Sequence, residues 1–277
     1  MSWTDLLLVP LGFAVGAYGA LVGVGGGFVL VPALLIIYPD ESQETITSIS
    51  LFVVLANSIS GSIAYARRGQ IDYRTGVLLA AVAVPASVAG AFAVRYLPRH
   101  YFDLAFGIFL LAVAALLLAG LARGTRSERA PLRPGRGVVV RTVRRPDGVT
   151  YRYAYDARQG LVLSAASGFI ATLFGVGGGI MQVPVMITVL RLPVDIAVAT
   201  SQFMLVFMSA SGTSLHAITG DFAFDELSQG ALLALGAVVG AQVGALLSRR
   251  LSGTTITRLL AVALVAVGIR LLLAPVL

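Results

Sequence analysis

Apolar segments long enough to cross a lipid bilayer recur along this chain of 277 residues and constrain its fold more than any other feature. A helix of about 20 residues spans a hydrocarbon layer ~30 Å thick. Hydrophobic residues make up 57% of the chain and charged residues 12%, about half the ~25% found in soluble domains. We therefore expect an all-α, multi-pass protein of the cytoplasmic membrane that contacts lipid, with full-length helices at 46–66, 75–96, 101–121, 197–216, 227–248 and 256–274.

Two further apolar stretches, 6–38 and 160–190, are too long for one crossing, and each is interrupted by the same glycine-rich motif. The motif G-V-G-G-G-x-x-x-V-P begins at Gly23 and begins again at Gly175, 152 residues later. The arms on either side of the glycines are shorter than a full span, so we predict re-entrant half-helices that meet near the membrane midplane. Non-helical backbone is tolerated at that depth only where protein buries it or where it lines a cavity.

Shared spacing extends beyond the glycines and indicates an internal duplication. Ser50 and Gly61 match Ser201 and Gly212, each residue lying 151 positions before its counterpart. Because each glycine-interrupted stretch is predicted to begin and end on one side, each repeat crosses an odd number of times. Two such repeats in tandem are inverted, as in many secondary transporters. We interpret the chain as two transmembrane repeats joined by a linker, with boundaries at 1–122, 123–158 and 159–277.

The linker contains ten arginines and three acidic residues, so it alone carries the whole net charge of +7. This distribution follows the rule that arginine-rich loops face the cytoplasm, and it does not indicate nucleic-acid binding. The basic loops 67–74 and 249–258 are predicted on the same side, and the acidic loops 39–45 and 217–226 on the other. Apolar and polar residues alternate over 138–155 around a Pro-Asp-Gly turn, which predicts a small cytoplasmic β-hairpin. The linker is either a tether that touches anionic lipid or a regulatory element.

The glycine motif itself has two interpretations. Small residues let membrane helices approach closely, a role that we expect of Gly236, Gly240 and Gly244 at four-residue spacing. Alternatively, the motif is a chain break that exposes the backbone N–H groups of helices beginning near Phe28 and Ile180. The positive end of the helix dipole favours an anion there. A dinucleotide site is excluded, because Phe28 and Ile180 stand where that fingerprint needs glycine or alanine.

Polar side chains that follow the glycines in otherwise apolar helices are candidates for the same site. Ser50 and Ser201 are the matched pair, and Asn57 and Gln182 add amide donors. No Asp, Glu or Arg lies in the middle of a predicted span, so the site is neutral and suits a small anion better than a metal ion. With no cysteine and two histidines, the chain predicts no metal centre, no cofactor and no catalytic residue. His216 is either a structural residue or a proton-coupling group.

The duplicated glycine motif, each copy followed by a helix with serine or threonine, resembles the TauE/SafE family of sulfite exporters. The later pattern Gly240-Ala241-x-x-Gly244-Ala245 resembles it too. The resemblance covers both repeats and omits the linker. It implies transport of sulfur-containing anions such as sulfite, sulfoacetate or related organosulfonates. Because the sequence holds no catalytic dyad, we expect a transporter and not an enzyme. The two repeats predict transport by alternating access, and an anion channel is the alternative. Proton coupling and a homodimer are both compatible with the sequence. The binding residues that the resemblance implies are Gly23, Gly25, Gly26, Gly27, Ser48, Ser50, Gly175, Gly177, Gly178, Gly179, Thr200 and Ser201.

Overall fold

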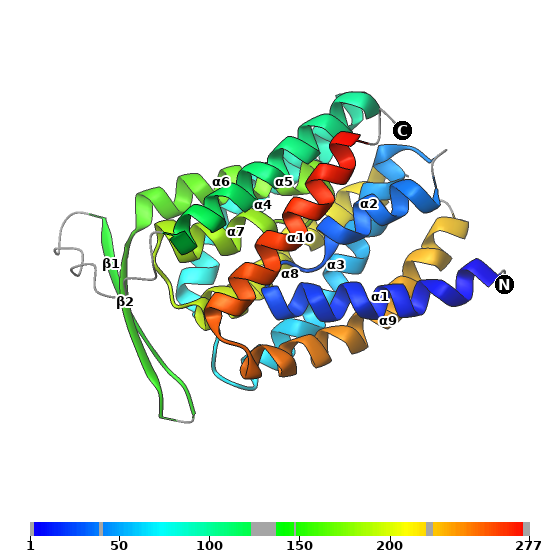
Figure 1. The fold of residues 1–277 in the computed structure, drawn as a ribbon. Helices are drawn as coiled ribbons and strands as arrows, with labels where there is room; N and C mark the ends of the chain where they lie inside the picture. The colour runs from blue at the N-terminus through cyan, green and yellow to red at the C-terminus, as the bar shows by residue number, and fades with distance from the viewer. Residues whose placement is uncertain (1–2, 39–40, 123–136, 147, 220–223, 274–277) are drawn as a thin grey trace.

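The structure, a computed structural model, describes residues 3–38, 41–122, 137–146, 148–219 and 224–273 (Figure 1). Six helices in it are long and apolar enough to cross a membrane. They correspond to the six predicted spans, which are therefore confirmed. Short 3₁₀ turns continue two of them, η1 (Val94–Tyr96) after α4 and η3 (Ser248–Arg250) after α9. The six helices are α3 (Gln43–Ala66), α4 (Tyr73–Ala93), α5 (Arg99–Ala122), α8 (Val194–Thr219), α9 (Phe224–Leu247) and α10 (Gly253–Leu273).

The two glycine-interrupted stretches each form two helices separated by the glycines. Helix α1 (Trp3–Val22) ends before the first break and α2 (Gly27–Ile37) follows it. Helix α6 (Ala157–Leu173) and α7 (Gly179–Pro184) flank the second break, and a π-helical turn, η2 (Val185–Val189), continues α7. Both helices after the breaks start one residue earlier than predicted. Their re-entrant path through a bilayer stays a prediction.

Helix α1 is longer than the sequence indicated. It has 20 residues, whereas the apolar pattern predicted an arm starting at residue 6. The difference arises because the helix begins at Trp3 and so takes in three residues that precede the apolar stretch. Helix ends commonly extend past an apolar pattern, because helical backbone hydrogen bonds do not depend on side-chain polarity.

Helix pairing is reciprocal between the two halves of the chain. Helix α1 packs along α9, and α6 packs along α4; α3 packs against α8, and α5 against α10 (Figure 1). In chain order, α1 to α5 of the first half correspond to α6 to α10 of the second half. The α1–α9 pair therefore corresponds to the α6–α4 pair. The α3–α8 and α5–α10 pairs each join two corresponding helices. A duplicated chain is expected to pair in this way, and the duplication itself stays a prediction. The inversion of the repeats across the membrane stays a prediction.

Glycines at the α1–α9 crossing allow the two backbones to touch. A methyl group added at Gly236, Gly240 or Gly244 of α9 would overlap a backbone carbonyl oxygen of α1. At the α4–α6 crossing, a methyl group added at Gly90 or Gly168 would likewise overlap a backbone carbonyl oxygen of the partner helix. Small residues commonly line membrane helix interfaces, because packing drives association where water is absent. The predicted packing role of the three α9 glycines is confirmed.

Apolar side chains also cover the outside of the bundle. The exposed fractions of Ile108, Leu235 and Val262, on three different long helices, are 55%, 63% and 67%. An apolar surface of this extent marks contact with a membrane or another protein. Together with the six spanning helices, it defines a multi-pass membrane protein.

The linker forms the predicted β-hairpin at one end of the bundle (Figure 1). Strands β1 (Val138–Arg144) and β2 (Thr150–Asp156) pair in antiparallel fashion, with Val138 opposite Asp156 and Arg144 opposite Thr150. The basic segment 123–136 lies outside the described residues, so its contact with lipid stays a prediction. The hairpin turn packs on the α3–α4 loop, because a methyl group at Gly69 would lie 2.8 Å from Cδ of Pro146.

Replacing Gly244 with alanine tests the α1–α9 crossing. The new methyl group would overlap the carbonyl oxygen of Ala17, so the helices must separate, which costs about 1–3 kcal/mol of unfolding free energy. Gly230→Ala, on the same helix, is the control: its methyl group would meet Phe52 at an ordinary 3.4 Å. The measurement is the thermal unfolding midpoint in detergent. Equal midpoints for the two variants would contradict the packing described here.

Candidate functional site

The two glycine breaks meet at the centre of the bundle. A methyl group added at Gly27 would lie 2.9 Å from Cα of Val176 and 3.0 Å from the carbonyl oxygen of Gly175. A methyl group at Gly179 would lie 2.5 Å from Cα of Val24. Only hydrogen fits at either position, so the first residue of each following helix touches the backbone of the other break. We call this contact the junction.

Glycine is required within the breaks for backbone reasons as well. A side chain costs about 1–2 kcal/mol at a left-handed residue. Each break holds three such residues, and each following helix is preceded by one of them, Gly26 for α2 and Gly178 for α7. The six glycines with positive φ are Gly23 (81°), Gly25 (80°), Gly26 (85°), Gly175 (69°), Gly177 (77°) and Gly178 (104°).

Helices α2 and α7 therefore both begin at the junction, so that two helix N-termini lie there. Neither Gly26 nor Gly178 can offer a side-chain cap, and none is supplied. The first N–H groups of a helix have no partner within the helix, and they carry the positive end of its dipole. Helix α7 continues into η2 without a gap, so its dipole extends over both. The arrangement offers backbone donors and partial positive charge, both suited to an anion.

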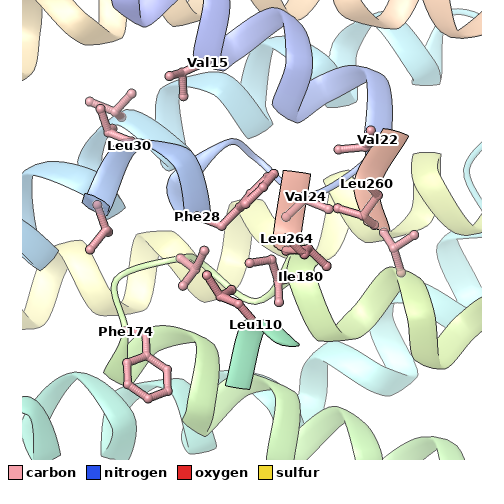
Figure 2. Packing of buried hydrophobic residues seen from close by; sticks show 14 of the residues in the cluster. Val15, Val22, Val24, Phe28, Leu30, Leu110, Phe174, Ile180, Leu260 and Leu264 are labelled. Atoms are coloured by element: carbon pink, nitrogen blue, oxygen red, sulfur yellow. The ribbon is translucent and has the colours of Figure 1, made fainter. Parts of the chain in front are cut away.

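Apolar side chains close the junction on the side shown in Figure 2. Phe28 and Ile180, the second residues of α2 and α7, pack with Val24, Leu260 and Leu264 in one cluster (Figure 2). Each of these five side chains is at most 1% exposed. Water is thus excluded from this side, and electrostatic attraction is stronger in such a low-dielectric surrounding.

Two apolar residues cover the breaks from α3 and α8. A methyl group at Gly25 would lie 2.9 Å from Cγ1 of Val54, and one at Gly177 would lie 2.5 Å from the same atom. Leu205 stands 3.2 Å and 3.3 Å from those two positions. The sequence pattern did not mark Val54 and Leu205 as site residues. Their 151-residue separation, the same as that of Ser50 and Ser201, was the available signal.

Two of the predicted polar residues hold the breaks in place. The Ser50 hydroxyl donates to the carbonyl oxygen of Gly175 at 2.7 Å. Nδ2 of Asn57 donates to the carbonyl oxygen of Gly25 at 3.0 Å. Helix α3 thereby contacts both breaks. The matched Ser201 differs: its hydroxyl is buried and has no hydrogen-bond partner within the described part of the chain.

The remaining polar candidates make their hydrogen bonds elsewhere. Ser48 donates to the carbonyl oxygen of Thr45 in its own helix at 2.7 Å, and Gln182 donates to the Ser164 hydroxyl of α6 at 3.0 Å. Thr200 accepts from the backbone N–H of Asp72 at 3.0 Å. His216 is buried fifteen residues beyond Ser201, which is ~22 Å along a helix. A role in binding or proton coupling for these four residues stays a prediction.

Asp72, in the α3–α4 loop, joins the hairpin to the bundle. Its carboxylate accepts two hydrogen bonds from the Arg141 guanidinium, at 2.7 and 3.0 Å, and one from the Tyr153 hydroxyl at 2.6 Å. Thr75 donates to the same carboxylate at 2.6 Å. Burial opposes ionisation of this group, but the hydrogen bonds from Arg141, Thr75 and Tyr153 outweigh it and lower the pKa of Asp72 to about 2. The hairpin is thus fixed to the loop that also bonds Thr200.

The spanning helices and the apolar outer surface define a multi-pass membrane protein, and its buried, uncapped helix ends are suited to an anion. The profile of the family described as "Sulfite exporter TauE/SafE" matches residues 8–271. The chain belongs to this family, which confirms the resemblance inferred from the glycine motifs. It also confirms the expectation of a transporter of the cell membrane and not an enzyme.

Relatives from bacteria and an archaeon support the same class. "Probable membrane transporter protein YunE" of Bacillus subtilis is 30% identical over 274 residues, covering 96% of this chain and 97% of that protein. A probable membrane transporter protein of Methanocaldococcus jannaschii is 28% identical, covering 76% and 73% respectively. One from Xylella fastidiosa is 26% identical, covering 94% and 90%. No solved structure matches the chain.

Asp72→Asn tests the hairpin attachment. It replaces a charged acceptor of several hydrogen bonds, so the protection free energy of the hairpin should fall by about 1–3 kcal/mol. Hydrogen–deuterium exchange of residues 138–156 measures this. Glu44→Gln, which makes the same charge change at the other end of α3, should leave exchange unaltered. Unchanged protection in Asp72→Asn would show that the carboxylate does not hold the hairpin.

The wild-type attachment should also depend on pH in a defined way. Because the folded pKa of Asp72 is lowered, from 3.8 to about 2, its contribution is complete above 3.8 and is lost as the pH falls toward 2. Exchange of the hairpin, corrected for the intrinsic rate, should therefore be constant between about pH 7 and 5. A loss of protection within that range would contradict the assignment.

Proposed function

We propose that this protein carries small sulfur oxyanions, sulfite or an organosulfonate such as sulfoacetate, and binds them at the junction of the two glycine breaks. The observation that carries the proposal is the meeting of two uncapped helix N-termini in a buried contact. Helix N-termini bind anions because their N–H groups and dipole both face the ligand. The family description supplies the sulfur chemistry, and sulfite and sulfonate groups present similar oxygen acceptors.

The charge distribution supports an anion over a cation. Among the described residues, Asp72 is the one buried Asp, Glu, Lys or Arg, and it lies at the hairpin end. The same part of the chain holds no group of His, Cys, Asp and Glu that could bind a metal ion. Side chains at the junction thus add no formal charge. Binding by dipoles and hydroxyl groups alone is weak enough to allow release, as transport requires.

The polar candidates divide into two roles under this proposal. Ser50 and Asn57 position the breaks through the carbonyl groups of Gly175 and Gly25. Ser201, whose buried hydroxyl bonds to no described residue, donates to the anion. A buried hydroxyl without a partner is costly, about 1–3 kcal/mol, and a bound oxyanion removes that cost.

Alternating access would act through the residues that cover the junction. Val54 of α3 and Leu205 of α8 lie against both breaks, so separating α3 and α8 on one side uncovers the anion to that side. The π-helical turn after Pro184 gives α7 a deformable continuation. Such turns are frequent at functional sites. An anion channel would instead need both sides open together.

Flux of radiolabelled sulfite into proteoliposomes tests the proposal. Losing one hydrogen bond to an anion costs about 1.5–3 kcal/mol, so Ser201→Ala should raise the KM for sulfite about 10- to 100-fold. Ser209→Ala is the control, since Ser209 is also buried on α8 but donates to Leu205 of its own helix. Flux that is equal in both variants, or absent from the wild type for sulfite and sulfoacetate alike, would overturn the proposal.

Two further arms of the same assay address mechanism. Acceleration of uptake by sulfite inside the vesicles indicates a carrier, whereas its absence at saturating flux indicates a channel. A pH gradient that drives sulfite uptake in the wild type but not in His216→Gln would assign proton coupling to His216. A gradient effect that persists in the variant would exclude that residue as the coupling group.

A further inference from the structure

A cavity of about 180 Å³ lies where the hairpin meets the bundle. Its walls come from the end of α3, the α3–α4 loop, the start of α8, η3 and the start of α10. Arg145 of the hairpin also lines it. Its polar lining consists of Tyr65, Gln70, Arg145, Asp195, Ser248 and Arg249.

Positive charge gathers at this cavity. Arg145 of the hairpin and Arg249 of η3 both line it. Arg68 lies nearby: burial, and then the charges of Arg249 and Arg145, lower the pKa of its guanidinium. Asp195 is the one carboxylate in the lining, and it accepts a hydrogen bond from the Tyr151 hydroxyl at 3.1 Å. Three guanidinium groups and one carboxylate therefore give this region a net positive charge. A net positive charge attracts small anions.

The cavity is adjacent to the first glycine break. Val198 lines it and also packs on Gly23, where a methyl group would lie 2.8 Å from Cα of Val198. The Tyr65 hydroxyl donates to the carbonyl oxygen of Ala20, at the end of α1, at 2.8 Å. One layer of side chains thus separates the cavity from the break.

Gln70 gives the cavity wall an unsatisfied polar group. The residue is 4% exposed, and its amide oxygen bonds to no other residue in the part of the chain that the structure describes. A buried polar atom of this kind usually has a partner. A protonated oxyanion, or its hydration water, bound in the cavity would provide one.

We propose that this cavity is an entry site that binds a small oxyanion on the hairpin side of the junction, with Arg145 and Arg249 as its charged ligands. The identity of the ligand as the transported sulfur oxyanion rests on the proposed function. The linker then has a role beyond that of a tether, because it supplies one of the two ligands. Guanidinium groups suit this role, since their fixed N–H donors match the oxygens of an oxyanion.

Equilibrium binding of radiolabelled sulfate and sulfite to purified protein in lipid nanodiscs tests the entry site. The Ser201→Ala background removes the hydroxyl that we assign to the junction, so that binding there does not dominate the signal. In this background Arg145→Ala should weaken binding about tenfold or more, while Arg145→Lys, which keeps the charge, should retain most of it. Arg152→Ala is the matched control, because Arg152 is exposed on the same hairpin and does not line the cavity.

The outcomes separate the two proposals. Weaker binding in Arg145→Ala than in Arg152→Ala, with rescue by lysine, supports the entry site even if no sulfite flux is found, in which case the proposed function alone fails. Equal binding by the two alanine variants would show that the hairpin contributes only general surface charge. That result, or an absence of sulfate and sulfite binding to the starting protein, overturns the entry site.

Discussion

The direct backbone contact between the two glycine breaks determines how the surrounding helices are arranged. Gly27 and Gly179 leave no room for a side chain, and the six left-handed glycines turn the chain sharply enough to start α2 and α7 at the contact. Other elements support this arrangement: α3 holds both breaks through Ser50 and Asn57. Close crossings of α1 with α9 and of α4 with α6 fix the helices that lead into the breaks.

Two features of this contact support the anion site that we propose. The helix ends supply donors and partial charge without a formal cation, and apolar side chains around Phe28 and Ile180 exclude water. Formal positive charge is kept at a distance, at the hairpin-side cavity around Arg145 and Arg249. Under the two proposals, an anion is first attracted by full charges and then bound by dipoles. Strong attraction and easy release are separated in space, which suits transport.

Much of the fold could be predicted from the sequence, because its determinants are local. About 20 apolar residues form a spanning helix whatever surrounds them, and left-handed glycines break helices wherever they occur. The alternation of apolar and polar residues on either side of Pro146 predicted the β-hairpin, because this pattern too is local. The polar contacts could not be predicted, because they join distant segments. The Thr200 hydroxyl accepts a hydrogen bond from the backbone N–H of Asp72. The Ser50 hydroxyl donates to the carbonyl oxygen of Gly175 in the second glycine break, whereas the hydroxyl of the matched Ser201 has no partner among the described residues. Val54 and Leu205 could not be recognised as site residues, because the residue type of an apolar side chain on an apolar helix does not show which neighbour it contacts.

Diffraction or cryo-electron microscopy of the protein with selenite, a heavier analogue of sulfite, would locate the proposed anion site. We expect a selenium peak at the junction, within hydrogen-bonding distance of backbone N–H groups at the starts of α2 and α7 and of the Ser201 hydroxyl. In Ser201→Ala protein the peak should weaken. A selenium position remote from both glycine breaks, with the junction unchanged, would contradict the account.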